Sequence, residues 1–378
     1  EFINLFGDDR DVFVLSAPGR TEVCGNHTDH NNGKVLAASI NLDAIAIAAK
    51  RDDMKINEKS EGHGLNEVDI STLSPDEAEY GRSSSMIKGV AAGLKEKGYE
   101  IGGFDACTTS DVMGGSGLSS SAAFEVLIAT VINHLYNDGK IDAVTVAKAA
   151  QFSENVYFGK PSGLLDQMAS SVGTFVTIDF KDTANPVIKK VDFDFAKSGY
   201  SLCIVDTHGN HSDLTDDYAA VRGEMEAVAK AMGKNVLREV EYEEFFQSLD
   251  VLKEKVNDRA LLRAFHFFGE NERVDKAVSS LENYDLDSVK QVMTESGYSS
   301  FLYNQNGTRN AYGSHQGRYM WQFVLNHGEC GHPFHRTDFR ESSPCNQNGT
   351  AQKHRGFCGT VPDTVPVPAP DNFCIVHN

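Results

Sequence analysis

A run of small residues just before a helical pattern constrains this chain more than any other segment does. Residues 112–123 read VMGGSGLSSSAA, so three glycines and four serines precede apolar residues at helical spacing. Glycine lets the backbone approach an anion closely, and the free N–H groups and dipole of a helix start favour phosphate. The run lacks the lysine of a Walker loop and the spacing of a dinucleotide-binding turn. It therefore predicts a phosphate-binding loop; the alternative is a small-residue turn with a serine cap.

A second segment, residues 17–30, follows a short predicted strand and concentrates polar side chains. Arg20, Asn26, His27, Asp29 and His30 fall within eleven positions. Each sugar hydroxyl needs both a donor and an acceptor, which asparagine, histidine and aspartate supply together. This pattern favours a site for a polyhydroxylated ligand, and the alternative is a solvated loop. A metal site made of the two imidazoles and Asp29 is disfavoured, because three ligands within four residues rarely satisfy a metal's geometry.

A third segment, residues 163–171, places the single carboxylate of Asp166 among apolar and small residues. A buried aspartate is costly unless it is paired, and Arg20 is the best candidate for its partner. The alternative is that Asp166 caps a helix. Glu154 lies twelve residues earlier on a predicted helix, where a lone glutamate usually faces solvent.

The remaining pattern predicts a mixture of strands and helices without a regular strand–helix–strand repeat, which indicates an α+β fold. The predicted strands are 13–15, 44–48, 172–178 and 202–205. The predicted helices are 84–98, one that follows Gly117, 142–157, 216–232 and 258–281, with a break near Gly269.

Charge and composition exclude several classes of partner. The net charge is −19, which argues against nucleic acid or an anionic membrane as the main partner. No apolar run approaches the roughly 18 residues of a membrane-spanning helix, and no secretory signal is visible. The seven cysteines form no CxxC pair. The first three, Cys24, Cys107 and Cys203, are widely spaced, which predicts single thiols in a reducing cytoplasm.

The composition changes near residue 300. Residues 301–378 carry a net charge of +1 and hold six of the ten prolines, but only two leucines and one isoleucine. So few branched aliphatic residues make an ordinary packed core difficult to build there. An alternative use of this stretch is a zinc site, with ligand-type side chains at His327, Cys330, His332, His335 and Cys345.

The three segments, in this order and spacing, resemble the galactokinases of the GHMP small-molecule kinase superfamily. Residues 19–29 resemble the signature Gly-Arg-x-Asn-x-x-Gly-Glu-His-Thr-Asp. Residues 112–123 resemble the phosphate loop Pro-x-Gly-x-Gly-Leu-Ser-Ser-Ser-Ala, and residues 163–167 resemble the segment Gly-x-x-Asp-Gln. The resemblance extends over about residues 12–300, and residues 356–360 resemble the third, glycine-rich motif of the superfamily.

Several positions depart from the family pattern. Asn26 stands where most galactokinases have Glu, and Glu22 stands where the signature often has Asn. Met113 replaces the proline of the phosphate loop, and His354 and Arg355 replace expected glycines near the third motif. Asn26 retains an acceptor and adds a donor, so sugar binding with altered preference is expected.

The resemblance implies a two-lobed fold with the active site in the cleft. The N-terminal lobe, residues 1–185, would be ribosomal protein S5 domain 2-like, and the C-terminal lobe, residues 186–378, would be ferredoxin-like. The implied partners are galactose and ATP, with no nucleic acid and no membrane, and the implied state is a monomer or a weak homodimer.

The implied reaction is transfer of the γ-phosphoryl group of ATP to the anomeric hydroxyl of galactose. Asp166 and Arg20 would be catalytic, and Ser120 and Glu154 would hold Mg²⁺. The phosphates would lie on Gly114, Gly115, Ser116, Gly117, Leu118, Ser119, Ser120 and Ser121. The sugar would contact Asn26, His27, Asp29, Gly163, Asp166 and Tyr218.

The sequence leaves two alternatives to this reaction. One is a kinase for N-acetylgalactosamine, arabinose or mevalonate, since Asn26 leaves room for another substrate. The other is a non-catalytic sensor that binds galactose and ATP. Relatives of that kind carry a shortened Ser-Ala part of the phosphate loop, whereas residues 120–123 are intact here.

Overall fold

The computed structural model describes residues 1–114, 117–160, 162–198, 200–206, 215–305, 321–326 and 373–377. The chain divides into two compact units: Glu1–Phe193 with His211–Gly317, and Asp194–Asn210 with Arg318–Asn378. The helices described after residue 210 therefore belong to the same unit as the first strands of the chain. The predicted lobes, residues 1–185 and 186–378, are a different division of the chain from these two units. That division stays a prediction.

The first unit is built on a seven-stranded mixed sheet. Its strands are β1 (Val12–Cys24), β2 (Lys34–Lys50), β3 (Lys55–Ser60), β4 (Leu65–Asp69), β5 (Phe104–Ser110), β6 (Phe175–Asp179) and β7 (Val187–Val191). The long strand β2 pairs with β1 along one edge, from Val12 opposite Ala49 to Cys24 opposite Leu36. Strands β5 and β6 pair with different halves of β2, so they share its other edge. All of these pairs are antiparallel, whereas β3 and β5 are parallel.

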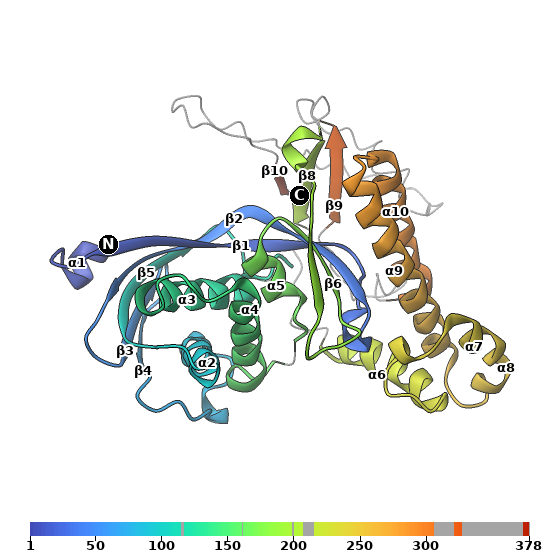
Figure 1. Cartoon of the computed structure of the whole chain (residues 1–378), viewed down its shortest axis with the longest axis horizontal. Coiled ribbons are helices and arrows are strands. Elements are labelled where there is room, and N and C mark those ends of the chain that lie inside the picture. Colours follow the sequence, from blue (N-terminus) through green and yellow to red (C-terminus); the bar gives the residue numbers. More distant parts are fainter. Residues whose placement is uncertain are drawn as a thin grey trace, which may run out of the picture. The chain divides into compact units, whose positions relative to one another are not determined.

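Ten helices are described in this unit, and they combine with the sheet as an α+β fold, as predicted. They are α1 (Phe2–Phe6), α2 (Ser83–Glu96), α3 (Ser120–Tyr136), α4 (Ala143–Phe152), α5 (Leu165–Val172), α6 (Thr215–Ala231), α7 (Tyr242–Gln247), α8 (Leu249–Leu252), α9 (Asp258–Glu282) and α10 (Leu286–Ser299). Helices α2, α3, α4 and α5 lie together on one side of the sheet, with α3 and α5 packed on β1 and β2 (Figure 1).

The short helix α5 is held by the apolar core beneath it. Leu165, Met168 and Ala169 are buried against Val35 and Val176 of the sheet. Because these residues recur at helical spacing, Asp166 is directed away from the core and is only half-buried. The core thus positions the helix, and the helix positions Asp166 in its first turn.

Two predicted boundaries are wrong. The predicted strand 172–178 begins only at Phe175, because α5 continues to Val172. The break expected near Gly269 is absent from α9, which is continuous from Asp258 to Glu282. A glycine inside a helix costs about 1 kcal/mol relative to alanine. The buried side chains Phe267 and Val274 on either side of Gly269 provide packing that offsets this cost.

The described part of the second unit contains a short 3-10 helix, Phe195–Lys197, and a three-stranded sheet. Its strands are β8 (Tyr200–Asp206), β9 (Trp321–Asn326) and β10 (Phe373–His377). Strand β8 is central, antiparallel to β9 and parallel to β10, and it contains the predicted strand 202–205. The five candidate zinc ligands and the glycine-rich segment 356–360 lie outside the described residues. None of the described helices has the length and apolarity that a membrane span requires.

Candidate active site

The strand β1 and the helix α5 meet at an ion pair between two predicted catalytic residues. Nε of Arg20 donates to Oδ1 of Asp166 over 2.7 Å, although the two residues are 146 positions apart in the chain. The hydroxyl of Ser119 donates to the other carboxylate oxygen of Asp166. One carboxylate therefore joins the sugar-type segment to the end of the phosphate loop, as the burial argument predicted for its partner Arg20.

The phosphate loop is fastened to β1 by backbone contacts. The N–H of Arg20 donates to the carbonyl of Leu118 over 3.1 Å, and its guanidinium donates to the carbonyl of Gly117 over 2.6 Å. A Cβ at Gly19 would lie 3.1 Å from that Leu118 oxygen, so glycine permits the close approach. Gly115 and Ser116 lie outside the described residues.

Ser119 precedes α3 in a left-handed backbone conformation, with φ of 60°. A non-glycine residue seldom occupies this region without compensation. Here the compensation is the hydrogen bond from its hydroxyl to Asp166. Helix α3 starts at the next residue, so its free N–H groups lie beside the carboxylate and the loop, where a phosphate would be favoured.

Asp166 carries a negative charge at neutral pH. Burial by itself would raise its pKa, but the charge of Arg20 and the hydrogen bonds from Arg20 and Ser119 outweigh burial, so the pKa is lowered. Asp166 also lies in the first turn of α5, where a helix favours a carboxylate. This group can orient a hydroxyl and accept its hydrogen bond.

The sugar-type segment folds into a tight turn that brings Asp29 against Gly163. A Cβ placed on Gly163 would lie 2.0 Å from Oδ2 of Asp29, so the carboxylate rests directly over the glycine. The turn is stabilised by Thr28, which is fully buried and whose hydroxyl donates to the carbonyls of Gly25 and Lys34. The structure thus brings Asp29 and Gly163 together, as the sugar-site prediction requires.

His27 is neutral at physiological pH. Burial, followed by the nearby charges of His30, His266 and Arg263, lowers its pKa to about 3. It has a left-handed backbone, with φ of 59°. A neutral imidazole supplies one donor and one acceptor, which suits a sugar hydroxyl.

Helix α9 supports the turn from a distant part of the sequence. The carboxylate of Glu270, which is fully buried, accepts hydrogen bonds from the backbone N–H of Gly25, from the thiol of Cys24 and from Arg273. Nε2 of His266 contacts the carbonyl of Asn26 at 2.9 Å. Sequence reasoning missed both α9 residues, because nothing in the helical pattern of 258–282 distinguishes them.

Glu154 lies on a π-helical turn, Ser153–Tyr157, and faces the start of α3. Its buried carboxylate accepts from the hydroxyls of Ser121 and Ser162 and from the ammonium of Lys160, and the amide of Gln167 also donates to it. The predicted solvent-facing alternative is therefore wrong. Oxygen donors suit Mg²⁺, and the bound ammonium shows that this carboxylate already holds a cation. Ser121, rather than Ser120, makes the contact to Glu154.

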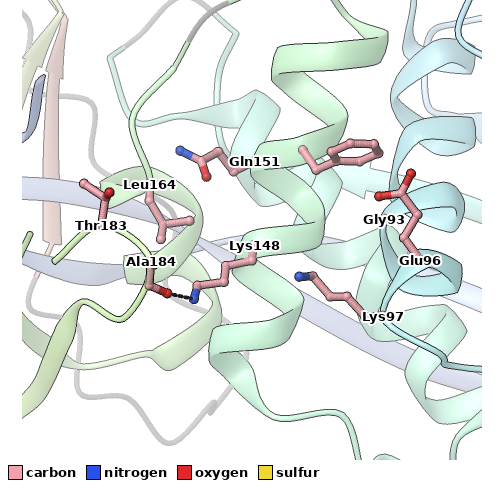
Figure 2. A pocket seen from close by; sticks show the side chains of 9 residues that line it. Gly93, Glu96, Lys97, Lys148, Gln151, Leu164, Thr183 and Ala184 are labelled. Carbon is pink, nitrogen blue, oxygen red and sulfur yellow. Dashed lines mark hydrogen bonds between the residues drawn. The ribbon is translucent and has the colours of Figure 1, made fainter.

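The remaining predicted sugar contact is Tyr218. It belongs to α6, and the structure describes its backbone but not its side chain. A separate pocket of about 310 Å³ lies between α2 and α4 (Figure 2). Lys97, Lys148 and Gln151 are among its lining residues, and Lys148 donates to the carbonyl of Ala184 over 2.9 Å. None of its lining residues is a predicted site residue.

Comparison with known families and structures agrees with this geometry. The model of the galactokinase galactose-binding signature matches residues 1–50, and the model of the GHMP kinase N-terminal domain matches residues 85–174. A galactokinase of Streptomyces coelicolor is 34% identical over 296 residues, which cover 78% of this chain and 75% of that protein. A galactokinase of Clostridium tetani is 32% identical over 309 residues, covering 79% and 76%.

Solved structures show the same fold. Lactococcus lactis galactokinase complexed with galactose superposes with a TM-score of 0.74 at 25% identity, covering 90% of this chain and 91% of that one. Methanococcus jannaschii mevalonate kinase has a TM-score of 0.55 at 14% identity, covering 80% and 82%, which concerns the fold alone. The fold and the loop at the start of α3 thus define a GHMP-type small-molecule kinase. Within that class, the chain belongs to the galactokinase family.

The contact between Asp29 and Gly163 predicts the effect of a single methyl group. In Gly163→Ala the new Cβ would displace the Asp29 carboxylate, because their present separation would be 2.0 Å. We expect KM for the sugar to rise about tenfold while KM for ATP stays within about twofold, on the scale of one lost hydrogen bond to a charged group. Steady-state kinetics with each substrate varied would measure both.

The matched control is Gly297→Ala on α10, where a Cβ would meet no atom within 4 Å. This control should leave both KM values unchanged and should not destabilise the protein. An unchanged KM for the sugar in Gly163→Ala would show that the Asp29 carboxylate does not contact the substrate.

Proposed function

We propose that this protein transfers the γ-phosphoryl group of ATP to the anomeric hydroxyl of galactose, giving galactose 1-phosphate and ADP. The observation that carries the proposal is the contact of Arg20 and Ser119 with one carboxylate, Asp166. This contact puts a predicted sugar-binding segment and a phosphate-type helix start into a single site. Membership of the galactokinase family supports the same substrate.

In the proposed mechanism, positioning and charge stabilisation supply most of the catalysis, as is usual in phosphoryl transfer. The anomeric oxygen attacks the terminal phosphorus, the bond to the ADP oxygen breaks, and the hydroxyl proton is released toward Asp166. Because Arg20 lowers the pKa of Asp166, this carboxylate is a weak base that mainly orients the hydroxyl. Arg20 lies beside the loop and would also stabilise negative charge on the transferred group.

We assign the phosphates to Gly114 through Ser121 and the sugar to Asn26, His27, Asp29, Gly163 and Tyr218. Glu154 with Ser120 would hold Mg²⁺, which neutralises phosphate charge in such reactions. The buried carboxylate of Glu154, with the hydroxyls of Ser121 and Ser162 beside it, fits a hard cation. Lys160 contacts Glu154 at 2.7 Å and would have to move away when the ion binds.

The first experiment is an ADP-release assay with ATP, Mg²⁺ and a panel of galactose, N-acetylgalactosamine, arabinose and mevalonate. Galactose-dependent turnover is the expected result. Turnover with another member of the panel only would replace galactose by that substrate and would implicate Asn26. Binding of galactose and ATP without turnover of any substrate would establish a sensor and overturn the kinase proposal.

The same proposal includes a cellular compartment and an oligomeric state. We propose a cytoplasmic protein that acts as a monomer or a weak homodimer. Cys24 and Cys107 are free thiols, which is typical of a reducing compartment.

A further inference from the structure

The side chain of Glu22 has no part in the mechanism above, although it lies among the groups proposed to hold the sugar. It follows Arg20 by two residues on β1, so both side chains emerge from the same face of the strand, about 7 Å apart. The intervening Thr21 is buried on the opposite face, whereas Glu22 is half-buried. The strand thus directs Glu22 toward the side of the sheet where Arg20 meets Asp166.

The charges around Glu22 come from four different elements. Its carboxyl group interacts electrostatically with four side chains: Arg20 of β1, Asp29 of the signature turn, Asp166 of α5 and Glu270 of α9. Arg20 is already committed to Asp166 and to the carbonyl of Gly117. Within the described residues, the Glu22 carboxyl group makes no hydrogen bond and no ion pair. Arg20 therefore pairs with Asp166, and Glu22 is left without an ion-pair partner among the described residues.

This arrangement favours the protonated form of Glu22. Burial is the largest cause, and the negative charges of Asp29, Asp166 and Glu270 add to it, while Arg20 opposes it, so that the pKa rises to about 8. A neutral carboxyl group offers one O–H donor and an acceptor oxygen, which is the combination that a sugar hydroxyl requires. It also adds no negative charge where the terminal phosphate of ATP must approach.

We propose that Glu22 is a further substrate-contacting and specificity-determining residue, which binds one hydroxyl of the sugar through its neutral carboxyl group. The proposal rests on the proposed function. It predicts that the same site prefers sugars that bear the hydroxyl group contacted by Glu22. It also accounts for the two departures from the signature together. This chain carries the carboxyl group on the strand, at Glu22, and the amide on the turn, at Asn26.

The test is a double-mutant cycle between the protein and the sugar. The wild type and Glu22→Ala are assayed with galactose and with its 2-, 3-, 4- and 6-deoxy analogues. For one analogue, kcat/KM of the wild type should fall about tenfold more than that of Glu22→Ala, because the partner of the missing hydroxyl is already absent in the variant. The other analogues should show equal ratios. Glu67→Ala, an exposed glutamate on β4, is the matched control and should behave like the wild type.

The outcomes separate this proposal from the proposed function. Equal ratios for all four analogues, with galactose turned over normally, would overturn the role of Glu22 and leave the kinase proposal intact. If another sugar is the substrate, the cycle is run on its deoxy analogues. If no sugar turns over, the cycle is run on galactose binding by calorimetry, and an absence of galactose binding would overturn both proposals.

A second readout follows from the titration of Glu22. In the wild type, kcat/KM for the sugar should decline as the pH rises through about 8, because Glu22 loses the proton that it donates. Glu22→Gln is always neutral and should lose this decline while retaining activity at pH 7. Identical pH profiles for the two proteins would contradict the proposal.

Stability provides a readout that does not depend on activity. The folded protein holds the Glu22 proton up to about pH 8, whereas the unfolded chain releases it near 4.5. Stability therefore falls as the pH rises across this window, and thermal unfolding of Glu22→Gln should show a smaller fall. Glu125, whose pKa burial raises to about 9, titrates in both proteins and cancels from the comparison.

Discussion

Replacing Asp166 by Asn should lower kcat by about 10²–10⁴-fold, the usual contribution of a positioned acid–base group, while KM for ATP changes little. The substitution keeps the shape of the side chain but removes the charge that faces the sugar hydroxyl. It also leaves the Arg20 guanidinium without its anionic partner, which is 2.7 Å away in the structure. Steady-state kinetics with galactose and with ATP, together with an ATP-binding measurement, would separate the loss of chemistry from a loss of binding.

The control for Asp166→Asn is Asp275→Asn, which removes the same charge from an exposed carboxylate of α9 paired with Lys34. This control should leave kcat within about twofold, because an exposed ion pair contributes little. Retention of most of the activity by Asp166→Asn would show that another group orients the hydroxyl. It would therefore contradict the assignment of Asp166 as a catalytic residue.

Replacing Glu270 by Ala should destabilise the protein by about 3–5 kcal/mol, the usual cost of removing one partner from a buried charged network. Glu270 is fully buried and accepts from Arg273 and from the backbone N–H of Gly25. Without the carboxylate, these donors remain buried without an acceptor. Urea unfolding followed by circular dichroism would measure the change, and KM for the sugar should rise because Gly25 begins the signature turn.

The exposed Glu272 lies on the same helix, and Glu272→Ala should change the unfolding free energy by no more than about 0.5 kcal/mol. The charges of His266 and Arg273, with hydrogen bonds, overcome burial and lower the pKa of Glu270. Its contribution to stability is therefore present above about pH 4.5 and is lost as the pH falls through the lowered pKa. A Glu270→Ala protein as stable as the Glu272→Ala control would refute the supporting role of α9.

The local motifs of the site could be predicted from the sequence because each depends on neighbours in the chain. The glycines and serines of 112–123 lead into α3, and Asp142 caps α4. Both features depend only on residues that are close together in the sequence. The contact between Arg20 and Asp166 was also predictable, since a carboxylate among apolar residues needs a cationic partner and Arg20 is the arginine of the polar segment 17–30. The predicted break at Gly269 failed because packing against distant residues outweighs a local helix preference.

The sequence alone therefore determined the class of protein, the phosphate loop, the sugar-type turn and the carboxylate that joins them. Only the tertiary structure decided how these parts are supported and charged. Glu270 and His266 reach the turn from α9, more than 200 residues away, and Glu22 acquires three acidic neighbours from three other elements. Packing between distant elements creates these contacts, and burial with the sum of the surrounding charges sets each pKa. The spacing of residues along the chain does not show which distant elements come into contact, how deeply a side chain is buried or which charges surround it.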